Sequence, residues 1–363
     1  MKILSVCDVL FPQTTGGAGR IARELAEAFM KMGAEVEFLT RFTGKASPNG
    51  DKVTYFQPPG KAFPGHYRKI FLKTVKRFDP DLIHVHQPFP ACLSIASFSS
   101  KPVVYNYYSP WSEEFKMKFS LLPRSLRKIM SPLLAAAERR VVHRATAIIV
   151  LSQFSNHQLM QLHDREAVLI PGGVNSERFR PTGEKPSDNT LRLITVRNLV
   201  PRMGLPQLIR AMSLLPPHIE LTIGGQGPLQ DELMGLISSL SLSERVRLAG
   251  HVPDEDLPLF YSSANWFVLP TVALEGFGLV TLESLSCGTP VLGTRIGATP
   301  ELLEKFDSQW IIQEPTAKEI AATILRVIEK PTPSPDELHQ RVAEEFDWKN
   351  IAKLYLEVFE SLV

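Results

Sequence analysis

Short apolar runs alternate with amphipathic stretches along nearly the whole chain. Such runs are typical of buried parallel strands, and apolar positions three to four residues apart are typical of the helices that cover them. Before residue 180 we predict strands at residues 2–9, 35–39, 82–86, 103–107 and 147–151. The pattern then restarts, with strands predicted at residues 191–196, 218–224, 246–248, 266–269, 290–293 and 310–312. The sequence therefore predicts an α/β protein with two doubly wound, Rossmann-like domains.

A polar segment separates the two halves of this pattern. Residues 182–190 read TGEKPSDNT, which is rich in turn-forming residues and contains no aliphatic side chain. We therefore expect a linker at residues 181–189 between a first domain of residues 1–180 and a second domain of residues 190–345. A last amphipathic helix at residues 348–363 has no strand partner, and we expect it to pack back on the first domain.

Charge is distributed unevenly between the two halves. The chain has 363 residues with 40 Lys and Arg and 38 Asp and Glu, which gives a formal net charge of +2. Residues 1–180 contain 25 basic and 14 acidic residues, net +11, whereas residues 181–363 contain 15 and 24, net −9. We therefore expect the first half to face an anionic partner.

Cysteine usage and hydropathy indicate the compartment. Cys7, Cys92 and Cys287 are odd in number and far apart, which suits neither a disulfide framework nor a zinc cage. The apolar start of the chain has one basic residue, contains Asp8 and lacks a clean cleavage site for a signal peptidase. No uncharged run approaches the roughly 20 apolar residues of a membrane span. We therefore expect a cytoplasmic protein, and leave open a peripheral contact at the inner face of the cell membrane.

A glycine-rich loop that contains Gly16 and Gly17 follows the first predicted strand and leads directly into a helix. Backbone N–H groups at such a helix start can bind a phosphate. Residues 17–22 also match the G-x-G-x-x-A pattern, which leaves a nicotinamide-dependent dehydrogenase as an alternative. Two features count against the dehydrogenase: the loop before the glycines is long, and Arg41 ends the second strand where an acidic residue is needed.

A second candidate phosphate site follows the strand predicted at residues 266–269. Glu275 lies in a loop with Gly276 and Gly278, and Glu283 follows about one turn into the next helix. Loop N–H groups at the helix start can bind a diphosphate, and two carboxylates can accept hydrogen bonds from hydroxyls. The pattern indicates a site for a nucleoside diphosphate sugar. An acidic loop residue followed by a glutamate that interacts with the helix dipole is the structural alternative.

The spacing from Glu275 to Glu283 resembles the E-x7-E motif of the retaining GT-B glycosyltransferases of family 4. Further matches occur in order along nearly the whole chain: the glycine loop, DPDLIHVH at 79–86, IPGGVN at 170–175, GGQGPL at 224–229 and CGTPV at 287–291. The resemblance implies a GT-B fold, in which two Rossmann-like lobes face each other across a cleft. It also implies a retaining, metal-independent hexosyltransferase.

The resemblance assigns roles to individual residues. Glu275 would hold hydroxyls of the donor sugar, and Glu283 would take the ribose hydroxyls. The backbone amides that would approach the sugar and the diphosphate are those of Gly16, Gly17, Phe277, Gly278 and Leu279. A front-face reaction, in which the leaving phosphate acts as the base, is what the family implies.

Three positions depart from the family pattern. Asn198 and Met203 stand where the family has an Arg and a Lys as a phosphate clamp, and Tyr108 stands where it commonly has a His. We expect Arg197 and Arg202 to supply the charge, with Arg202 favoured, because Arg makes bidentate phosphate contacts. Tyr108, with a reference pKa of about 10, can donate a hydrogen bond but will not carry a proton near neutral pH. The expected catalytic residues are Glu275, Arg202 and Tyr108, and Arg197 and Asn198 join the expected donor-binding residues.

We expect no metal site and no cofactor besides the donor, a UDP-sugar or GDP-sugar. The D-x-D triplets at residues 79–81 and 254–256 precede a strand and open a helix, so we interpret both as turn and cap residues. We expect His84 and His86 to point to opposite faces of a strand, which would prevent paired metal ligation, and at least one to be a core histidine.

Basic, amphipathic segments at residues 64–77 and 115–128 suggest where the acceptor binds. Such segments can lie on an anionic membrane, although a solvated basic face is the alternative. No recognition-helix or stacking-sheet motif for nucleic acid accompanies the charge. We predict sugar transfer to a hydroxyl of a surface-glycan or lipid-linked acceptor. A nucleotide-sugar-binding protein with little turnover, acting as a sensor or as the partner of an active transferase, is the alternative that the three departures suggest.

Overall fold

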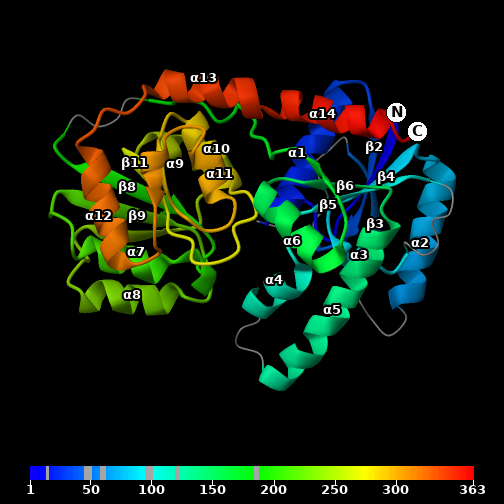
Figure 1. Cartoon of the computed structure of the whole chain (residues 1–363), viewed down its shortest axis with the longest axis horizontal. Coiled ribbons are helices and arrows are strands. Elements are labelled where there is room, and N and C mark those ends of the chain that lie inside the picture. Colours follow the sequence, from blue (N-terminus) through cyan, green and yellow to red (C-terminus); the bar gives the residue numbers. More distant parts are fainter. Residues whose placement is uncertain (14–15, 45–50, 58–62, 95–100, 119–122, 184–187) are drawn as a thin grey trace. The chain divides into compact units, whose positions relative to one another are not determined.

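The computed structural model describes the whole chain except residues 14–15, 45–50, 58–62, 95–100, 119–122 and 184–187. The chain forms two compact units (Figure 1). The first consists of Met1–Gly172 together with Trp348–Val363, and the second consists of Gly173–Asp347. Each unit is built on a parallel β-sheet, as the sequence pattern predicts.

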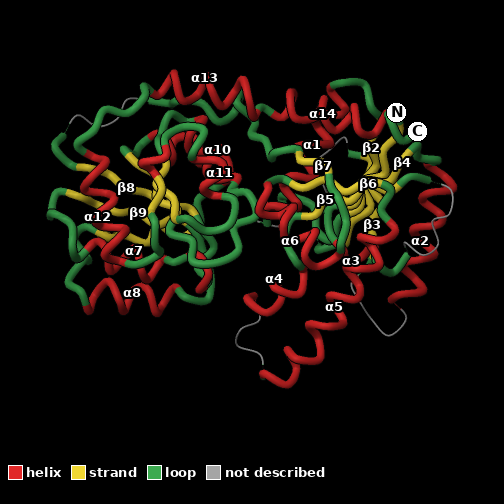
Figure 2. The backbone as a smooth tube through the Cα atoms, in the orientation of Figure 1, coloured by secondary structure: helices red, strands yellow, loops and turns green. Residues whose placement is uncertain are grey.

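The first unit has a parallel sheet whose described strands are ordered β3-β2-β1-β4-β5-β6-β7. Figure 2 draws the strands of both units in yellow. These strands are β1 (Lys2–Val6), β2 (Glu35–Arg41), β3 (Lys52–Phe56), β4 (Leu82–Val85), β5 (Val103–Tyr107), β6 (Ala147–Val150) and β7 (Val168–Leu169). Its helices are α1 (Gly17–Lys31), α2 (Phe63–Phe78), α3 (Pro88–Ala91), α4 (Trp111–Lys118), α5 (Arg124–Arg144), α6 (Gln153–His163) and α14 (Trp348–Glu360). The sequence pattern misses β3 and β7 because both are edge strands that bury little apolar surface.

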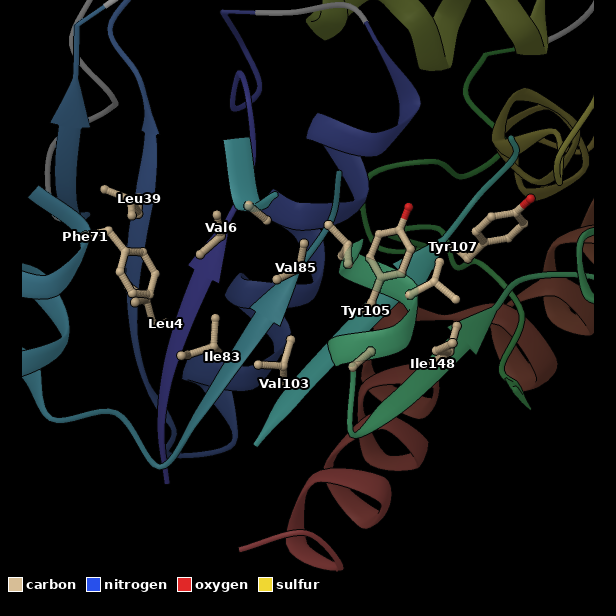
Figure 3. Close-up of a cluster of buried hydrophobic side chains, with 14 of the residues drawn as sticks. Leu4, Val6, Leu39, Phe71, Ile83, Val85, Val103, Tyr105, Tyr107 and Ile148 are labelled. Carbon is tan, nitrogen blue, oxygen red and sulfur yellow. The ribbon is translucent and has the colours of Figure 1, made fainter. Parts of the chain in front are cut away.

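One face of the first sheet carries a continuous apolar cluster. Leu4, Ile83 and Tyr105 from neighbouring strands point to this face and pack in one cluster with Phe71 of α2 (Figure 3). Alternate residues of each strand share a face, so this cluster uses every second position. Full burial of such side chains stabilises the folded state by about 1.5–3 kcal/mol each.

Aromatic side chains of α14 cover the opposite face of the first sheet. The ring of Phe359 lies 5.5 Å from that of Phe29 in α1 and 5.1 Å from that of His84 in β4, measured between centroids. Tyr355 lies 6.2 Å from Phe29. Residues 348–360 are thus part of the core of the first unit, although they follow the whole second unit in sequence.

The second unit has a parallel sheet whose described strands are ordered β10-β9-β8-β11-β12-β13. These strands are β8 (Leu191–Val196), β9 (Ile219–Gly224), β10 (Val246–Gly250), β11 (Trp266–Leu269), β12 (Val291–Thr294) and β13 (Ile311–Ile312). Its α-helices are α7 (Leu205–Met212), α8 (Gln230–Ser239), α9 (Leu257–Ser262), α10 (Leu279–Ser286), α11 (Thr299–Leu303), α12 (Ala317–Ile328) and α13 (Pro335–Phe346). Short 3-10 helices occur at η2 (Pro201–Met203), η3 (Asp254–Asp256) and η4 (Ser308–Trp310). Each strand coincides with a predicted run.

The boundary between the units differs from the expected linker at residues 181–189. The chain passes from the first unit to the second after Gly172, because the following residues make their contacts in the second unit. The N–H of Val174 donates to the carbonyl of Phe346 at 2.9 Å, and the carbonyl of Phe179 accepts from the Ser286 hydroxyl at 2.5 Å. The expected linker was placed from polar composition, whereas the boundary lies where the contacts of the chain change from one unit to the other.

Candidate active site

The loops that carry the expected donor site meet at one edge of the second sheet. β8 and β11 are neighbours in the sheet and run parallel, so the loops that follow them emerge at the same edge. The loop after β8 contains Arg197 and Arg202, and the loop after β11 contains Glu275. Residues that are far apart in sequence are thereby brought together.

Arg197 and Glu275 form a buried ion pair. Arg197 Nη2 donates to Glu275 Oε2 at 2.6 Å, with side chains that are only 5% and 11% exposed. The hydroxyl of Thr271 donates to the same oxygen at 3.1 Å. Within the described part of the chain these bonds all go to Oε2, which leaves Glu275 Oε1 as an acceptor for a ligand hydroxyl.

The charge of Glu275 is set by these neighbours. Burial alone would raise the pKa of the carboxyl, but Arg197, Arg202 and the Thr271 hydrogen bond outweigh burial and lower the pKa below its usual value of 4.5. Glu275 is therefore ionised at neutral pH. An ionised carboxylate accepts hydrogen bonds and donates none, so this group suits the binding of hydroxyls.

Gly297 and Arg202 fix the backbone around Glu275. Arg202 Nη1 donates to the carbonyl of Leu274 at 2.7 Å, and Leu274 has a left-handed φ of 51°. The carbonyl of Glu275 accepts from the N–H of Ala298 at 2.8 Å. A Cβ at Gly297 would lie 2.1 Å from that carbonyl oxygen, so only glycine permits this approach. Arg202 thus lies beside the carboxylate and also supports its loop.

The helix α10 begins directly beside Glu275. Its N-cap, Gly278, has a φ of 84° and makes no side-chain capping bond, and a Cβ built on it would lie 3.8 Å from the Glu275 carboxyl carbon. N–H groups in the first turn of a helix have no partner within the helix and favour an anion. Leu279 is the first residue of this helix, and Phe277 before it is buried. This places the expected amides of Phe277, Gly278 and Leu279 next to the carboxylate.

Glu283 lies in the same helix and is also buried. The hydroxyl of Tyr261, a fully buried residue of α9, donates to Glu283 Oε2 at 2.7 Å. Tyr261 therefore orients this carboxylate. Sequence reasoning missed Tyr261, Thr271 and Gly297, because a hydroxyl donor or a glycine gains this role only from its place in the fold.

Asn198 and Met203, the two residues of the loop after β8 that depart from the family pattern, supply no positive charge. Met203 is buried, and its sulfur accepts hydrogen bonds from Arg197 Nη2 at 2.7 Å and Nε at 3.1 Å. The side chain of Asn198 is exposed. Arg197 is thus held between a carboxylate and a thioether, while its Nη1 is buried with no hydrogen-bond partner among the described residues.

In the first unit, Gly16 and Gly17 lie at the start of α1, after β1. Gly16 is the N-cap, has extended backbone angles and makes no side-chain capping bond. The start of α1 therefore presents backbone rather than side chains, as expected for a phosphate-binding loop.

A buried polar network surrounds Tyr108 in the first unit. His86 Nδ1 lies 2.9 Å from the Tyr108 hydroxyl, and Asn106 Nδ2 donates to the same oxygen at 3.3 Å. Asn106 Nδ2 also donates to the hydroxyl of Tyr355 at 2.8 Å, and Asn106 Oδ1 lies 3.0 Å from His84 Nε2. The network joins β4, β5 and α14 to the side chain of Tyr108.

The expectation that His84 and His86 point to opposite faces is wrong. Residues two apart in a strand share a face, and the two ring centroids lie 4.1 Å apart. Both rings are buried, as expected for core histidines. Burial lowers the pKa of His84 to about 4, with the hydrogen bond to Asn106 opposing it, and burial together with His84 lowers the pKa of His86 well below 6.5. Both imidazoles are neutral at neutral pH.

The neutral state of His86 determines where the Tyr108 proton points. His86 Nε2 is buried with no partner among the described residues. Because an orphaned N–H costs more than an unused acceptor, we assign the proton to Nδ1, which then donates to Tyr108. Asn106 donates to the same hydroxyl, so the Tyr108 O–H is directed away from the network. Burial raises the pKa of Tyr108 well above 10, and the group remains a hydrogen-bond donor.

Three of the four aspartates of the two D-x-D triplets contact a basic residue or a backbone N–H. Asp79 pairs with Lys101, with 2.9 Å between Oδ1 and Nζ, and Asp81 accepts from the backbone N–H of Lys2 at 2.7 Å. Asp254 pairs with Arg178. Among the residues that the structure describes, no group of three or more His, Cys, Asp and Glu is arranged to hold a metal ion.

The two basic segments differ in how their charges are used. In the 64–77 segment, Arg77 is paired with the buried Glu37, whereas Lys69, Lys73 and Lys76 are exposed. Of the 115–128 segment, residues 119–122 lie outside the described residues. No described helix is both long and apolar enough to cross a membrane.

Two family models match successive parts of the chain. Residues 15–178 match the model described as Glycosyltransferase Family 4, and residues 176–345 match the model described as Glycosyl transferases group 1. Together they extend over the same two units that the structure contains.

Two relatives and one solved structure agree with these matches. The chain is 24% identical to a subunit of the phosphatidylinositol N-acetylglucosaminyltransferase of Arabidopsis thaliana, over 97% of this chain and 80% of that protein. It is 30% identical to the GDP-mannose-dependent alpha-(1-6)-phosphatidylinositol monomannoside mannosyltransferase of Mycolicibacterium smegmatis, over 47% of this chain and 50% of that protein. The structure of Anabaena Alr3699/HepE in complex with UDP and glucose matches with a TM-score of 0.79, at 22% identity over 100% of both chains. The likeness confirms the expected fold class.

Proposed function

Because the chain belongs to the GT-B glycosyltransferases of family 4, we propose that it transfers a sugar from a UDP- or GDP-linked donor to a hydroxyl of a glycan or lipid-linked acceptor, with retention of configuration. The observation that carries the proposal is the buried Arg197–Glu275 pair beside Arg202 and the start of α10. The relatives support it, since the names of both contain phosphatidylinositol, and one structural neighbour was solved with UDP and glucose.

In this proposal, catalysis is electrostatic. Negative charge develops on the leaving diphosphate, so hydrogen-bond donors that are already in position around it lower the activation barrier. Arg202, the Nη1 group of Arg197 and the first-turn amides of α10 would stabilise that charge, while Glu275 Oε1 would hold a sugar hydroxyl. Tyr108 would add one neutral hydrogen-bond donor.

We propose no metal ion for this reaction. Three of the four aspartates in the D-x-D triplets, Asp79, Asp254 and Asp81, are engaged with Lys101, Arg178 and the Lys2 backbone. Activity is therefore expected to survive EDTA. A loss of activity in EDTA that manganese restores would contradict the metal-free mechanism.

Donor turnover tests the proposed function. Release of nucleoside diphosphate is measured with UDP-glucose, UDP-N-acetylglucosamine and GDP-mannose, after a thermal-shift comparison of UDP and GDP has identified the base. We expect release from at least one donor, and a loss of about 100-fold or more in Glu275→Gln. Glu329→Gln, an exposed glutamate at the end of α12, is the matched control and should behave as the wild type.

A nucleotide-sugar-binding protein with little turnover is the second candidate. It is favoured by the buried thioether of Met203 and the exposed side chain of Asn198, which leave the usual clamp positions without positive charge. A thermal shift by UDP or GDP without any release of nucleoside diphosphate would support this candidate over the transferase.

We also propose that α5 contacts an anionic membrane from the cytoplasmic side. No residue of its segment 124–137 is buried, and Figure 1 shows this end of the helix extending from the rest of the first unit. Ile129 and Leu133 are 61% and 59% exposed. The cationic side chains of α5 are Arg124, Arg127, Lys128, Arg139, Arg140 and Arg144. Its acid, Glu138, is buried, so the exposed charge of the helix is entirely positive, which suits anionic lipid.

A further inference from the structure

The side chain of Met203 fixes the guanidinium of Arg197. Its sulfur accepts hydrogen bonds from Arg197 Nε at 3.1 Å and from Nη2 at 2.7 Å. Nε–H and one N–H of Nη2 lie along the same edge of the planar guanidinium, so two bonds to one atom hold the whole plane. Both residues are buried, which keeps water from competing for these bonds. The thioether therefore determines how the guanidinium lies.

Two of the five N–H groups of the Arg197 guanidinium remain available. Nε and Nη2 carry three of them, and these bind the Met203 sulfur and Glu275 Oε2. The other two belong to Nη1, which is buried with no hydrogen-bond partner among the described residues. Buried N–H groups without a partner are costly, so this end of Arg197 needs an acceptor from outside the described chain.

The backbone holds Met203 in a fixed place. Met203 ends η2, and the next residue, Gly204, has a φ of 70°. A Cβ built on Gly204 would lie 1.8 Å from the carbonyl oxygen of Pro270, so only glycine lets η2 pack this closely on the chain that leaves β11. The N–H of Val272 also donates to the carbonyl of Arg202 at 2.9 Å. The position of the Met203 backbone is thus tied to the loop after β11.

A thioether suits this position because it accepts hydrogen bonds without carrying charge. A lysine ammonium, which the family has here, carries only donors and would repel the guanidinium of Arg197. A carboxylate would add a second negative charge beside Glu275 and cancel the attraction of Arg197 for an anion. The methionine therefore fits an arginine that makes the phosphate contact in place of the lysine.

We propose that Met203 is a positioning residue of the donor site, which holds Arg197 so that Nη1 binds a phosphate oxygen of the nucleoside diphosphate. The inference rests on the proposed use of such a donor. Met203 acts through Arg197 and needs no contact with the donor itself. The missing lysine is then compensated within the same loop.

Phosphate-dependent binding to the full chain tests this role. Calorimetry gives the dissociation constants of UDP and GDP, and ligand-observed NMR gives those of uridine and guanosine. The readout is the factor by which the diphosphate tightens binding of its nucleoside, because general damage to the site would weaken both. We expect Met203→Leu, which removes the acceptor at similar volume, to reduce this factor about tenfold. Met203→Gln, whose amide oxygen can again accept from the guanidinium, should keep a factor close to that of the wild type.

Met212→Leu is the matched control, because Met212 is a buried methionine of α7 whose sulfur makes no hydrogen bond to a described residue. It should leave the factor unchanged. An unchanged factor in Met203→Leu, or an equal loss in the leucine and glutamine variants, overturns the inference. A wild-type chain that binds neither diphosphate more tightly than its nucleoside overturns it as well.

Donor hydrolysis by the same wild-type sample separates this inference from the proposed function. Hydrolysis together with an unchanged factor in Met203→Leu refutes the role of Met203 alone. A factor that falls in Met203→Leu and is kept in Met203→Gln, without hydrolysis, supports the role of Met203 and refutes only the transferase.

Discussion

The guanidinium of Arg197 donates a hydrogen bond of 2.6 Å to the carboxylate of Glu275, 78 residues further along the chain. The pair forms because β8 and β11 are adjacent, so the loops that follow them meet. Each residue therefore depends on the other: the arginine keeps the carboxylate ionised, and the carboxylate compensates a buried cation.

Removing one member of this pair should destabilise the second unit. Arg197→Met leaves the Glu275 carboxylate buried without its partner, which should lower the free energy of unfolding by about 3–5 kcal/mol. Urea unfolding followed by tryptophan fluorescence measures the loss. Arg295→Met removes the exposed Arg295–Glu304 pair and should change the stability by at most about 1 kcal/mol. Equal unfolding midpoints for the two variants would contradict a structural role of the buried pair.

Stability should fall in mild acid because of His84. Its pKa is about 4 in the folded protein and 6.5 ordinarily, so the unfolded chain binds a proton that the folded chain excludes. The stability that depends on the neutral ring is present above pH 6.5 and is lost as the pH falls toward about 4. Thermal unfolding across this range should show a shallower pH dependence for His84→Gln, whose amide can donate to Asn106 without titrating. Identical slopes would contradict this.

Tyr108→Phe should lower donor turnover by about 100-fold, the loss expected for one donor near developing charge. The matched control is Tyr107→Phe, because the Tyr107 hydroxyl is buried without a partner among the described residues. Since the Tyr108 pKa lies well above 10, the wild-type rate should show no ionisation of this group near neutral pH. Tyr108→His should introduce a dependence of the rate near pH 6.5. Equal rates for the two phenylalanine variants would exclude Tyr108 from catalysis.

Binding of α5 to vesicles should depend on anionic lipid. The full chain should sediment with vesicles that contain phosphatidylglycerol and not with pure phosphatidylcholine, and salt should weaken the binding. Ile129→Ser combined with Leu133→Ser should reduce the partition at least about tenfold, given the apolar area removed. Leu162→Ser removes a leucine that is 55% exposed on α6, and serves as the control. Equal binding to neutral vesicles would contradict the membrane proposal.

Regular elements were predictable where burial imposes a clear apolar pattern. β11 and β12 of the second sheet coincide with apolar runs, because every residue of both strands is buried. β3 was missed because it lies at an edge of its sheet and most of its side chains are only half-buried. The boundary between the units was predicted at the wrong place because amino-acid composition indicates which segments are polar and not which residues they contact. The hydrogen bond from Val174 to Phe346 joins residues that are far apart in the sequence, and the local composition gives no sign of it.

The chemistry of the candidate site was only partly predictable. Glu275 was predicted as a site residue because a carboxylate in a glycine-containing loop before a helix is an unusual local pattern. Its bonds to Arg197 and Thr271 depend on which strands are neighbours, and strand order is not a local property. The Asn106 bond to Tyr355 joins β5 to α14, and the sequence contains no signal for such a contact.

The return of residues 348–360 to the first unit has a consequence for synthesis. A chain grows from its N-terminus, and domains generally fold as they emerge. Until Tyr355 and Phe359 have been made, Phe29 and His84 lack the rings that cover them, and Asn106 lacks the hydroxyl of Tyr355. A chain that ends at residue 347 contains every element of the second unit, whereas its first unit lacks α14. A released chain truncated after residue 347 should therefore contain a protease-resistant second unit and a protease-sensitive first unit.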